Sequence, residues 1–192
     1  MRPHVRGGHA RTYDASGGGL TIGGGEATWH PAFVLALMEK CQAEGINVAV
    51  DTCGYVDTPE GLDILKKADL LLFDVKGMDP EKHLEGTGVS NELIWRNLLM
   101  REELGKPVII RVPIIPGYSD STENLRSTAE ALSNLKCVQR VDLLPFHQYG
   151  RVKYRQIGME YTMNDTPEIP EERKTEIKEL FESYGLSVQI GG

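Results

Sequence analysis

Short runs of apolar, often β-branched residues alternate along the chain with amphipathic stretches. The predicted strands lie at 19–24, 46–52, 69–76, 107–115 and 138–146, with a last short strand at 186–192. Between them, apolar residues recur at three- and four-residue spacing, and this period predicts helices at 31–45, 58–68, 91–105, 119–135 and 169–185. Strands that alternate with helices predict βα units with a parallel sheet, and therefore an α/β fold.

The beginning of the chain lacks this period. Residues 1–12 are polar and basic, and we interpret them as a flexible tail that precedes one domain over 13–192. No change in composition indicates a second domain. The predicted loop from about 147 to 168 is long, and loops of such length often carry function.

Composition and charge exclude several classes of partner. The chain has 192 residues and a formal net charge of -7, which argues against general binding to nucleic acids or anionic membranes. No apolar run approaches the roughly 18 residues of a membrane span, and no secretory segment follows Met1. We therefore expect a cytoplasmic protein without a membrane or nucleic-acid partner.

Charged side chains gather where the predicted strands end. They are Glu26, Asp51, Asp74, Lys76, Arg111 and His147. Each has a structural alternative, such as a turn cap for Asp51, an ion pair for Arg111 or a loop position for His147. In parallel α/β folds, however, ligands bind beyond the carboxyl ends of the strands, and the repetition at five strands predicts a ligand site there. The mixture of charges suits a zwitterionic ligand with an amine and a carboxylate.

The segment SGGGLTIGGGE at 16–26 places six glycines around a short strand. It is not a Walker A loop, because Gly24 and Gly25 stand where that loop has Lys and Ser or Thr. It is not a dinucleotide fingerprint, because Ile22 occupies the place of the third glycine. We interpret it as a strand that ends in bare backbone, open to a ligand, with Glu26 beside it.

Five segments together resemble the glycyl-radical-enzyme activating enzymes, which are radical S-adenosylmethionine (SAM) proteins similar to pyruvate formate-lyase activase. They are SGGGLTIGGGE, DTCGYVD, LLLFDVKGMDPEKHLEGTGVSNELI, IIRVPIIPGYSD and VDLLPFHQYGRVKY, in family order from about Thr12 to Gly192. The resemblance implies a partial (β/α) barrel of the radical SAM type. In this chain we expect about five parallel strands with flanking helices, and the first strand and helix of the family absent.

The resemblance also implies an activity. The family binds SAM on a 4Fe-4S cluster and cleaves it with an electron from reduced flavodoxin or ferredoxin. The resulting 5'-deoxyadenosyl radical abstracts hydrogen from a glycine in a loop of a partner, the glycyl radical enzyme. Matching positions imply SAM binding by Gly24, Gly25, Glu26, Asp51, Thr52, Arg111 and His147, with a monovalent cation near Asp51 and Thr52. Asp74 and Lys76 match a catalytic pair at the cofactor and the substrate peptide.

The chain departs from the family most clearly in its cysteines. The family holds its cluster with Cys-x3-Cys-x2-Cys, whereas this chain has only Cys41, Cys53 and Cys137. Smaller departures are Gly23 in place of Ser and Ala27 in place of Pro. We therefore expect that this chain lacks the cluster-binding portion, binds SAM weakly and is inactive by itself. The open edge of its first strand favours self-association.

Two other functions stay open at this point. The chain could be a catalytically silent module that binds SAM or a partner protein, or an aldolase-like barrel with Lys76 as a Schiff-base nucleophile. The structural alternative for Lys76 is an ion pair with Asp74 or Asp79. We expect Met78 to pack in its loop and His83 to face solvent from a helix.

Overall fold

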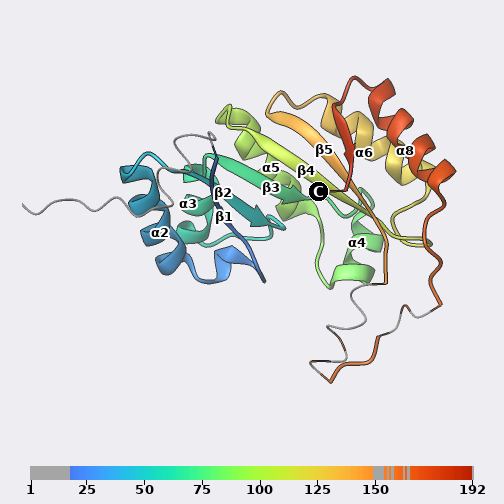
Figure 1. The fold of residues 1–192 in the computed structure, drawn as a ribbon, viewed down its shortest axis with the longest axis horizontal. Coiled ribbons are helices and arrows are strands. Elements are labelled where there is room, and N and C mark those ends of the chain that lie inside the picture. Colours follow the sequence, from blue (N-terminus) through green and yellow to red (C-terminus); the bar gives the residue numbers. More distant parts are fainter. Residues whose placement is uncertain are drawn as a thin grey trace, which may run out of the picture. The chain divides into compact units, whose positions relative to one another are not determined.

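The computed structural model of the chain describes residues 18–148, 154, 156, 158–161, 163 and 165–191. Its strands are β1 (Gly19–Ile22), β2 (Asn47–Thr52), β3 (Leu70–Asp74), β4 (Val108–Ile114), β5 (Val138–Pro145) and β6 (Val188–Ile190). They are hydrogen-bonded in this order (Figure 1). The pairs β1–β2, β2–β3 and β5–β6 are parallel. The α/β fold with a parallel sheet is confirmed, including the short last strand.

The helices begin and end close to the predicted positions. They are η1 (Ala27–Trp29), α2 (Pro31–Ala43), α3 (Pro59–Lys67), α4 (Pro80–Thr87), α5 (Glu92–Glu103), α6 (Thr122–Ser133) and α8 (Glu171–Ser183). The five helices that the spacing predicted are all present. Helix α4 was not among them, because eight residues are too few to display a period. Its start is marked instead by Asp79, whose Oδ1 accepts from the backbone of Glu81 and Lys82 at 2.9 and 3.1 Å.

The chain divides into two compact units, which we describe separately. Of the described residues, the first unit comprises 18–73 and 93–109, and the second comprises 74–92 and 110–191. The predicted tail at 1–12 falls outside the described residues. The single domain predicted over 13–192 stays a prediction.

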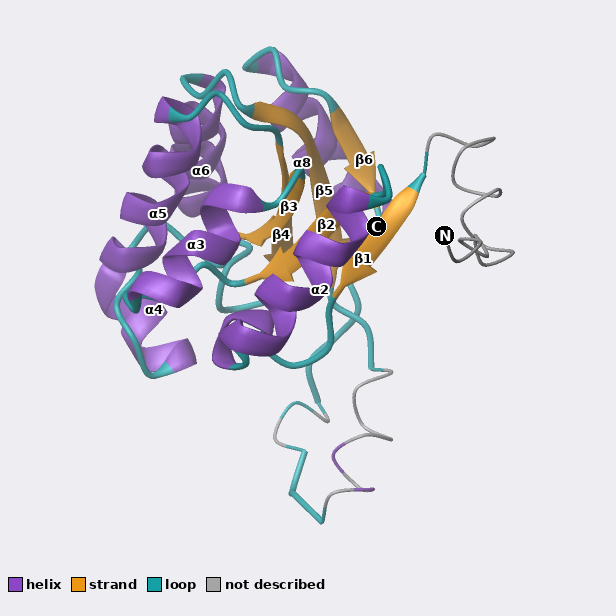
Figure 2. Cartoon of the chain, turned by 90° about the vertical axis from the view of Figure 1, so that its left-hand side faces the viewer, coloured by secondary structure: helices purple, strands orange, loops and turns teal. Residues whose placement is uncertain are grey.

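In the first unit, α2 packs against α3 and against β2 (Figure 2). The apolar core includes Val34, Met38, Val48, Val50, Ile64, Leu65, Leu71, Phe73 and Leu98. One cation lies inside this core: Arg101 of α5 is fully buried. Its guanidinium donates to the carbonyls of Leu65, Ala68 and Pro107 at 2.8, 3.1 and 3.0 Å, so it joins the end of α3 to the start of β4.

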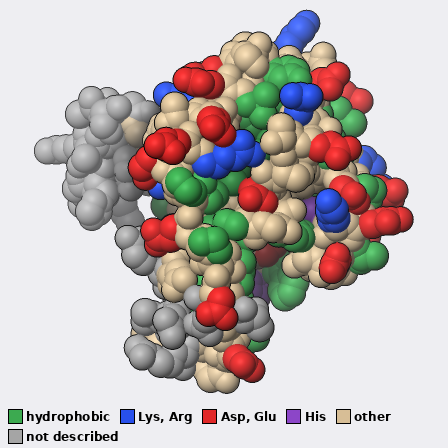
Figure 3. All heavy atoms as spheres, turned by 90° about the vertical axis from the view of Figure 1, so that its right-hand side faces the viewer, with side chains coloured by type: hydrophobic (Ala, Val, Ile, Leu, Met, Phe, Trp, Pro, Cys, Tyr) green, Lys and Arg blue, Asp and Glu red, His purple; other side chains and the backbone are tan. Residues whose placement is uncertain are grey.

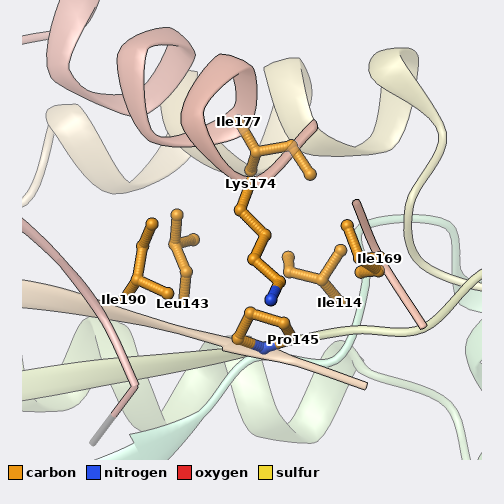
Figure 4. Close-up of a pocket in the computed structure, with 7 residues that line it drawn as sticks. All are labelled: Ile114, Leu143, Pro145, Ile169, Lys174, Ile177 and Ile190. Carbon is orange, nitrogen blue, oxygen red and sulfur yellow. The ribbon is translucent and has the colours of Figure 1, made fainter. Parts of the chain in front are cut away.

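In the second unit, α8 packs against α6 and β6 (Figure 1). A small apolar hollow lies between α8 and the strands, lined by Ile114, Leu143, Pro145, Ile169, Ile177 and Ile190 (Figure 4). The side chain of Lys174 extends into this hollow, and its ammonium pairs with Glu171 at 2.6 Å. Since most of its walls are buried aliphatic side chains, we regard the hollow as part of the core of this unit.

On the face shown in Figure 3, acidic and basic side chains are interspersed rather than gathered into a basic surface. This agrees with the expectation of no nucleic-acid partner, which stays a prediction. Among the described helices, none is long and apolar enough to cross a bilayer. Strand β1 stands at one end of the strand order. Self-association through this strand stays a prediction.

Candidate functional site

Strand β1 ends in a glycine turn, Gly23–Gly25, that leaves its backbone bare. All three residues are exposed, and Gly24 and Gly25 have φ angles of 88° and 59°. No atom lies within 4 Å of the place where a Cβ of either residue would stand. A ligand can therefore approach the main chain of this turn more closely than it could approach any other residue type.

The carboxylate of Glu26 ties the glycine turn to the end of β2. Its Oε1 accepts from Thr28 N at 3.2 Å, Thr28 Oγ1 at 2.9 Å and Thr52 Oγ1 at 2.8 Å, and its Oε2 accepts from Cys53 N at 2.9 Å. A carboxylate offers about four acceptor positions, so most of those of Glu26 are taken by the chain itself. Glu26 thus serves first to hold the turn.

The pKa of Glu26 reflects two opposed effects. Burial raises it, but hydrogen bonds from Cys53, Thr52 and Thr28 outweigh burial and lower the pKa below its ordinary value of 4.5. Glu26 is therefore a carboxylate at neutral pH, and its charge strengthens the hydrogen bonds that it accepts.

The loop that follows β2 is held from the opposite side by Asn97 of α5. The Asn97 side chain is buried, and its Nδ2 donates to Gly54 O at 2.8 Å and to Val56 O at 2.7 Å. Gly54 has a φ of 71°, and a Cβ on it would lie only 2.1 Å from the Phe73 ring. This loop therefore has little freedom, and it keeps Cys53 N within hydrogen-bond distance of Glu26 Oε2.

The structure brings together the site residues predicted in the first unit. Glu26 contacts Thr52, and the Asp51 carboxylate lies beside the turn, because a Cβ on Gly23 would be 3.4 Å from Asp51 Oδ2. Gly24 and Gly25 lie between Gly23 and Glu26 in the chain. The first unit thus places a fixed carboxylate, a second half-buried carboxylate and open backbone at the carboxyl ends of β1 and β2, which suits a cationic group.

In the second unit, Asp74 lies between two cations. Its Oδ1 accepts from Arg111 Nε at 2.8 Å and Arg111 Nη2 at 2.7 Å, and its Oδ2 is 3.3 Å from Lys76 Nζ. We call these three residues the acid–base cluster. Two positive charges face one negative charge, so the cluster suits an anionic group such as a carboxylate.

These contacts also bear on the structural alternatives. The ion pairs expected for Lys76 with Asp74 and for Arg111 with an acid are both present. The aldolase-like alternative for Lys76 stays a prediction.

His147 lies exposed just past β5. The preceding residue, Phe146, donates its N–H to Ile114 O at 2.9 Å, so His147 follows the carboxyl ends of β4 and β5. Its position agrees with the predicted site edge, and its role in binding stays a prediction.

Two asparagines that sequence reasoning missed hold the loop after Lys76. Asn91 Nδ2 donates to Gly77 O and Met78 O, both at 2.9 Å, and Met78 N donates to Asn124 Oδ1 at 2.9 Å. Asn97 was missed in the same way. No local signal could have found them, because each lies at least 13 residues from the backbone that it holds.

The prediction for His83 was wrong. This residue does lie on a helix, α4, but it is only 2% exposed. Its Nδ1 is 2.8 Å from Val89 O and 3.0 Å from Thr87 Oγ1. The reason is that the chain turns back at Gly88, directly after α4, and brings the Val89 carbonyl to the imidazole.

The three cysteines do not fit an iron–sulfur cluster. Cys41 lies in α2, Cys53 follows β2 and Cys137 precedes β5, and none is in a disulfide. Within the described part of the chain, no group of three or more His, Cys, Asp or Glu side chains could hold a metal ion. A cluster needs several thiolates around one site, and the described cysteines do not supply them.

Comparison with known proteins adds a family to this geometry. Residues 9–129 match the sequence model of the Radical SAM superfamily. The chain is 40% identical over 183 residues to the trans-4-hydroxy-L-proline dehydratase activating enzyme of Clostridioides difficile, covering 94% of this chain and 60% of that protein. It is 35% identical over 174 residues to the pyruvate formate-lyase-activating enzyme of Clostridium pasteurianum, covering 88% of this chain and 73% of that protein.

A solved structure gives the same result for the fold. It is a domain of the pyruvate-formate lyase-activating enzyme of Bacteroides vulgatus, with a TM-score of 0.75 and 31% identity, covering 91% of this chain and 99% of that chain. The resemblance and the partial barrel expected from the sequence are confirmed. This chain spans about 60% of the length of the Clostridioides difficile relative.

Proposed function

The chain belongs to the radical SAM superfamily, among the glycyl-radical-enzyme activating enzymes, and on this premise we propose that it binds SAM at the glycine turn after β1. The observation that carries the proposal is the open backbone of Gly24 and Gly25, held in place by the Glu26 carboxylate. In this proposal the SAM ammonium is received by main-chain carbonyls of the turn. Glu26 keeps those carbonyls in position and adds a nearby negative charge.

In the first unit, two further predicted residues lie beside the turn. Asp51, beside Gly23, faces the cationic part of the ligand or a monovalent cation. Thr52 acts through Glu26, because its hydroxyl already donates to that carboxylate. In the second unit, Arg111 and Lys76 offer positive charge to a carboxylate of a ligand or of a substrate peptide, and Asp74 orients both of them. His147, just past β5 in the same unit, keeps its predicted role in SAM binding.

For the whole protein we propose the activity that the relatives' names indicate. The names of the relatives include activating enzymes for a dehydratase, a lyase and a decarboxylase. Bound SAM would supply the radical that abstracts hydrogen from a glycine of the partner enzyme, with an electron from reduced flavodoxin or ferredoxin. Within this chain, Asp74 and Lys76 would contact the reacting region.

Calorimetric titration of the chain with SAM tests the binding proposal. We expect weak binding, with a Kd on the order of 100 µM, or about -5.5 kcal/mol. Gly25→Ala should abolish it, because a Cβ would stand in the space where the ligand approaches. Gly105→Ala is the matched control, since Gly105 has a φ of 61° and equally open surroundings. Absence of heat at about 1 mM SAM, or equal binding by both variants, would refute the proposal.

A second candidate is a module that binds SAM without turning it over. The observation in its favour is that the three cysteines do not form a cluster site. One measurement on the chain, incubated anaerobically with iron, sulfide and dithionite, can exclude the silent module. Formation of 5'-deoxyadenosine from SAM, detected by mass spectrometry, would exclude it, whereas binding without this product is expected of both candidates, because the chain by itself is expected to be inactive.

A further inference from the structure

We infer that Asn91 and Asn124 are positioning residues for the acid–base cluster. They hold the two residues that follow Lys76, and the inference rests on the proposed function in so far as Lys76 serves the site. Neither asparagine belongs to the set of residues predicted from the sequence. Both lie in the second unit together with Asp74, Lys76 and Arg111.

Asn91 holds the carbonyls of this loop. It is 4% exposed, and its single Nδ2 atom donates to Gly77 O and to Met78 O at 2.9 Å each. Two successive carbonyls can point at one nitrogen only if the backbone at Gly77 and Met78 has a defined conformation. The two protons of one amide group therefore fix the direction in which the chain leaves Lys76.

Asn124 holds the remaining polar group of the loop, the N–H of Met78. Its Oδ1 accepts from Met78 N at 2.9 Å, and its Nδ2 donates to Ser119 O at 2.9 Å. Ser119 in turn donates through Oγ to Pro113 O at 2.7 Å, just past Arg111 on β4. The loop that follows Lys76 is thereby connected to the strand that carries Arg111.

The backbone before Lys76 is fixed as well. Val75 N donates to Arg111 O at 2.9 Å. Lys76 thus stands between a ladder hydrogen bond on one side and the asparagine contacts on the other. Fixing a backbone conformation costs conformational entropy, so without the asparagines residues 77 and 78 would regain this freedom. The 3.3 Å approach of Lys76 Nζ to Asp74 Oδ2 would then be lost for part of the time.

Four variants test the inference on the chain without SAM. Asn91→Asp puts a carboxylate oxygen against two carbonyl oxygens, and Asn124→Leu removes the acceptor of Met78 N. Asn124→Asp is the intermediate case, because it keeps that acceptor but puts a carboxylate oxygen against Ser119 O. Asn134→Asp is the control: this exposed residue of the same unit donates to Glu130 O at 2.8 Å, away from the loop.

The measurement is the acetylation rate of Lys76 under trace labelling, taken relative to exposed Lys82 and read by mass spectrometry. We expect the ratio to rise several-fold in Asn91→Asp and Asn124→Leu, because the amine leaves its ion pair. It should rise less in Asn124→Asp than in Asn124→Leu, and it should stay close to wild type in Asn134→Asp. A merely structural role would lower the melting temperature of the first two variants and leave the Lys76 to Lys82 ratio unchanged, which would overturn the inference.

Two further results keep the test decisive. If Asn91→Asp does not fold, as judged by circular dichroism, the test rests on the comparison of Asn124→Leu with Asn124→Asp. A SAM titration of the same variants should show several-fold weaker binding only where the labelling ratio rises. If the Lys76 to Lys82 labelling ratio rises in these variants but the wild-type chain does not bind SAM, the proposed function is refuted and the positioning role of the asparagines stands.

Discussion

The hydroxyl of Thr52 donates to Oε1 of Glu26 at 2.8 Å, and this contact joins the end of β2 to the residue that follows the β1 glycines. Two residues that the family resemblance assigns to cofactor binding are thus bound to each other. Their polar groups are used within the chain, which leaves the backbone of Gly24 and Gly25 as the open surface of the site.

Replacing Glu26 by Gln should destabilise the first unit. Gln keeps one oxygen, but its amide nitrogen would face a hydrogen-bond donor such as Cys53 N. We expect the free energy of unfolding to fall by about 1–3 kcal/mol, the range for hydrogen bonds to a charged group. Urea denaturation followed by circular dichroism measures it. Glu39→Gln, at an exposed position of α2, should change stability by less than about 0.5 kcal/mol. Equal effects of the two substitutions would contradict the role given to Glu26.

The contribution of Glu26 to stability should depend on pH. Its pKa is lower in the folded chain than the ordinary 4.5, so the folded state favours the ionised form. The stabilisation is therefore fully present above pH 4.5 and is lost as the pH falls through the folded pKa. We expect the stability difference between wild type and Glu26→Gln to shrink as the pH is lowered from 7 to about 3. A difference that stays constant over this range would show that the carboxylate is not the source.

Asn97→Ala should destabilise the first unit by about 1–3 kcal/mol, because it removes the side-chain donor of two buried carbonyls and leaves Gly54 O with the Val56 N–H alone. Thermal or urea unfolding checks this value. The matched control is Asn134→Ala, which removes one hydrogen bond from an exposed amide and should cost less than about 1 kcal/mol. If Asn97→Ala costs no more than its control, the loop after β2 is held by other contacts.

The ion pair of Asp74 with Arg111 should contribute little to stability and more to ligand binding. Both side chains are about one-fifth exposed, so solvent screens the pair. We expect a coupling free energy of about 1 kcal/mol in a double-mutant cycle of Asp74→Asn and Arg111→Met. SAM affinity should fall several-fold in either single variant. A coupling above about 3 kcal/mol, or unchanged SAM affinity, would contradict this division.

Helices could be predicted from the sequence where the apolar spacing of a helix coincides with a residue that starts or ends it. Helix α2 begins at Pro31, as predicted, and ends at Ala43, two residues before the predicted end at Gly45. Helix α4 has too few residues for a period. The burial of His83 also escaped prediction, because it depends on a turn at Gly88 that returns the chain over the imidazole. Similarly, Asn91, Asn97 and Asn124 act on backbone far away in the sequence.

The sequence by itself determined the alternation of strands and helices, and with it the strands on or after which Glu26 and Asp51 lie in the first unit and Asp74 and Arg111 in the second. It could do so because strand periods and strand ends are local features of the chain. Only the tertiary structure decided which polar groups of each unit are engaged within the chain. Glu26 is engaged with Thr28, Thr52 and Cys53, and Asp74 with Lys76 and Arg111. Hydrogen bonds between distant residues form only when packing brings donors and acceptors within about 3 Å, and no local pattern records that.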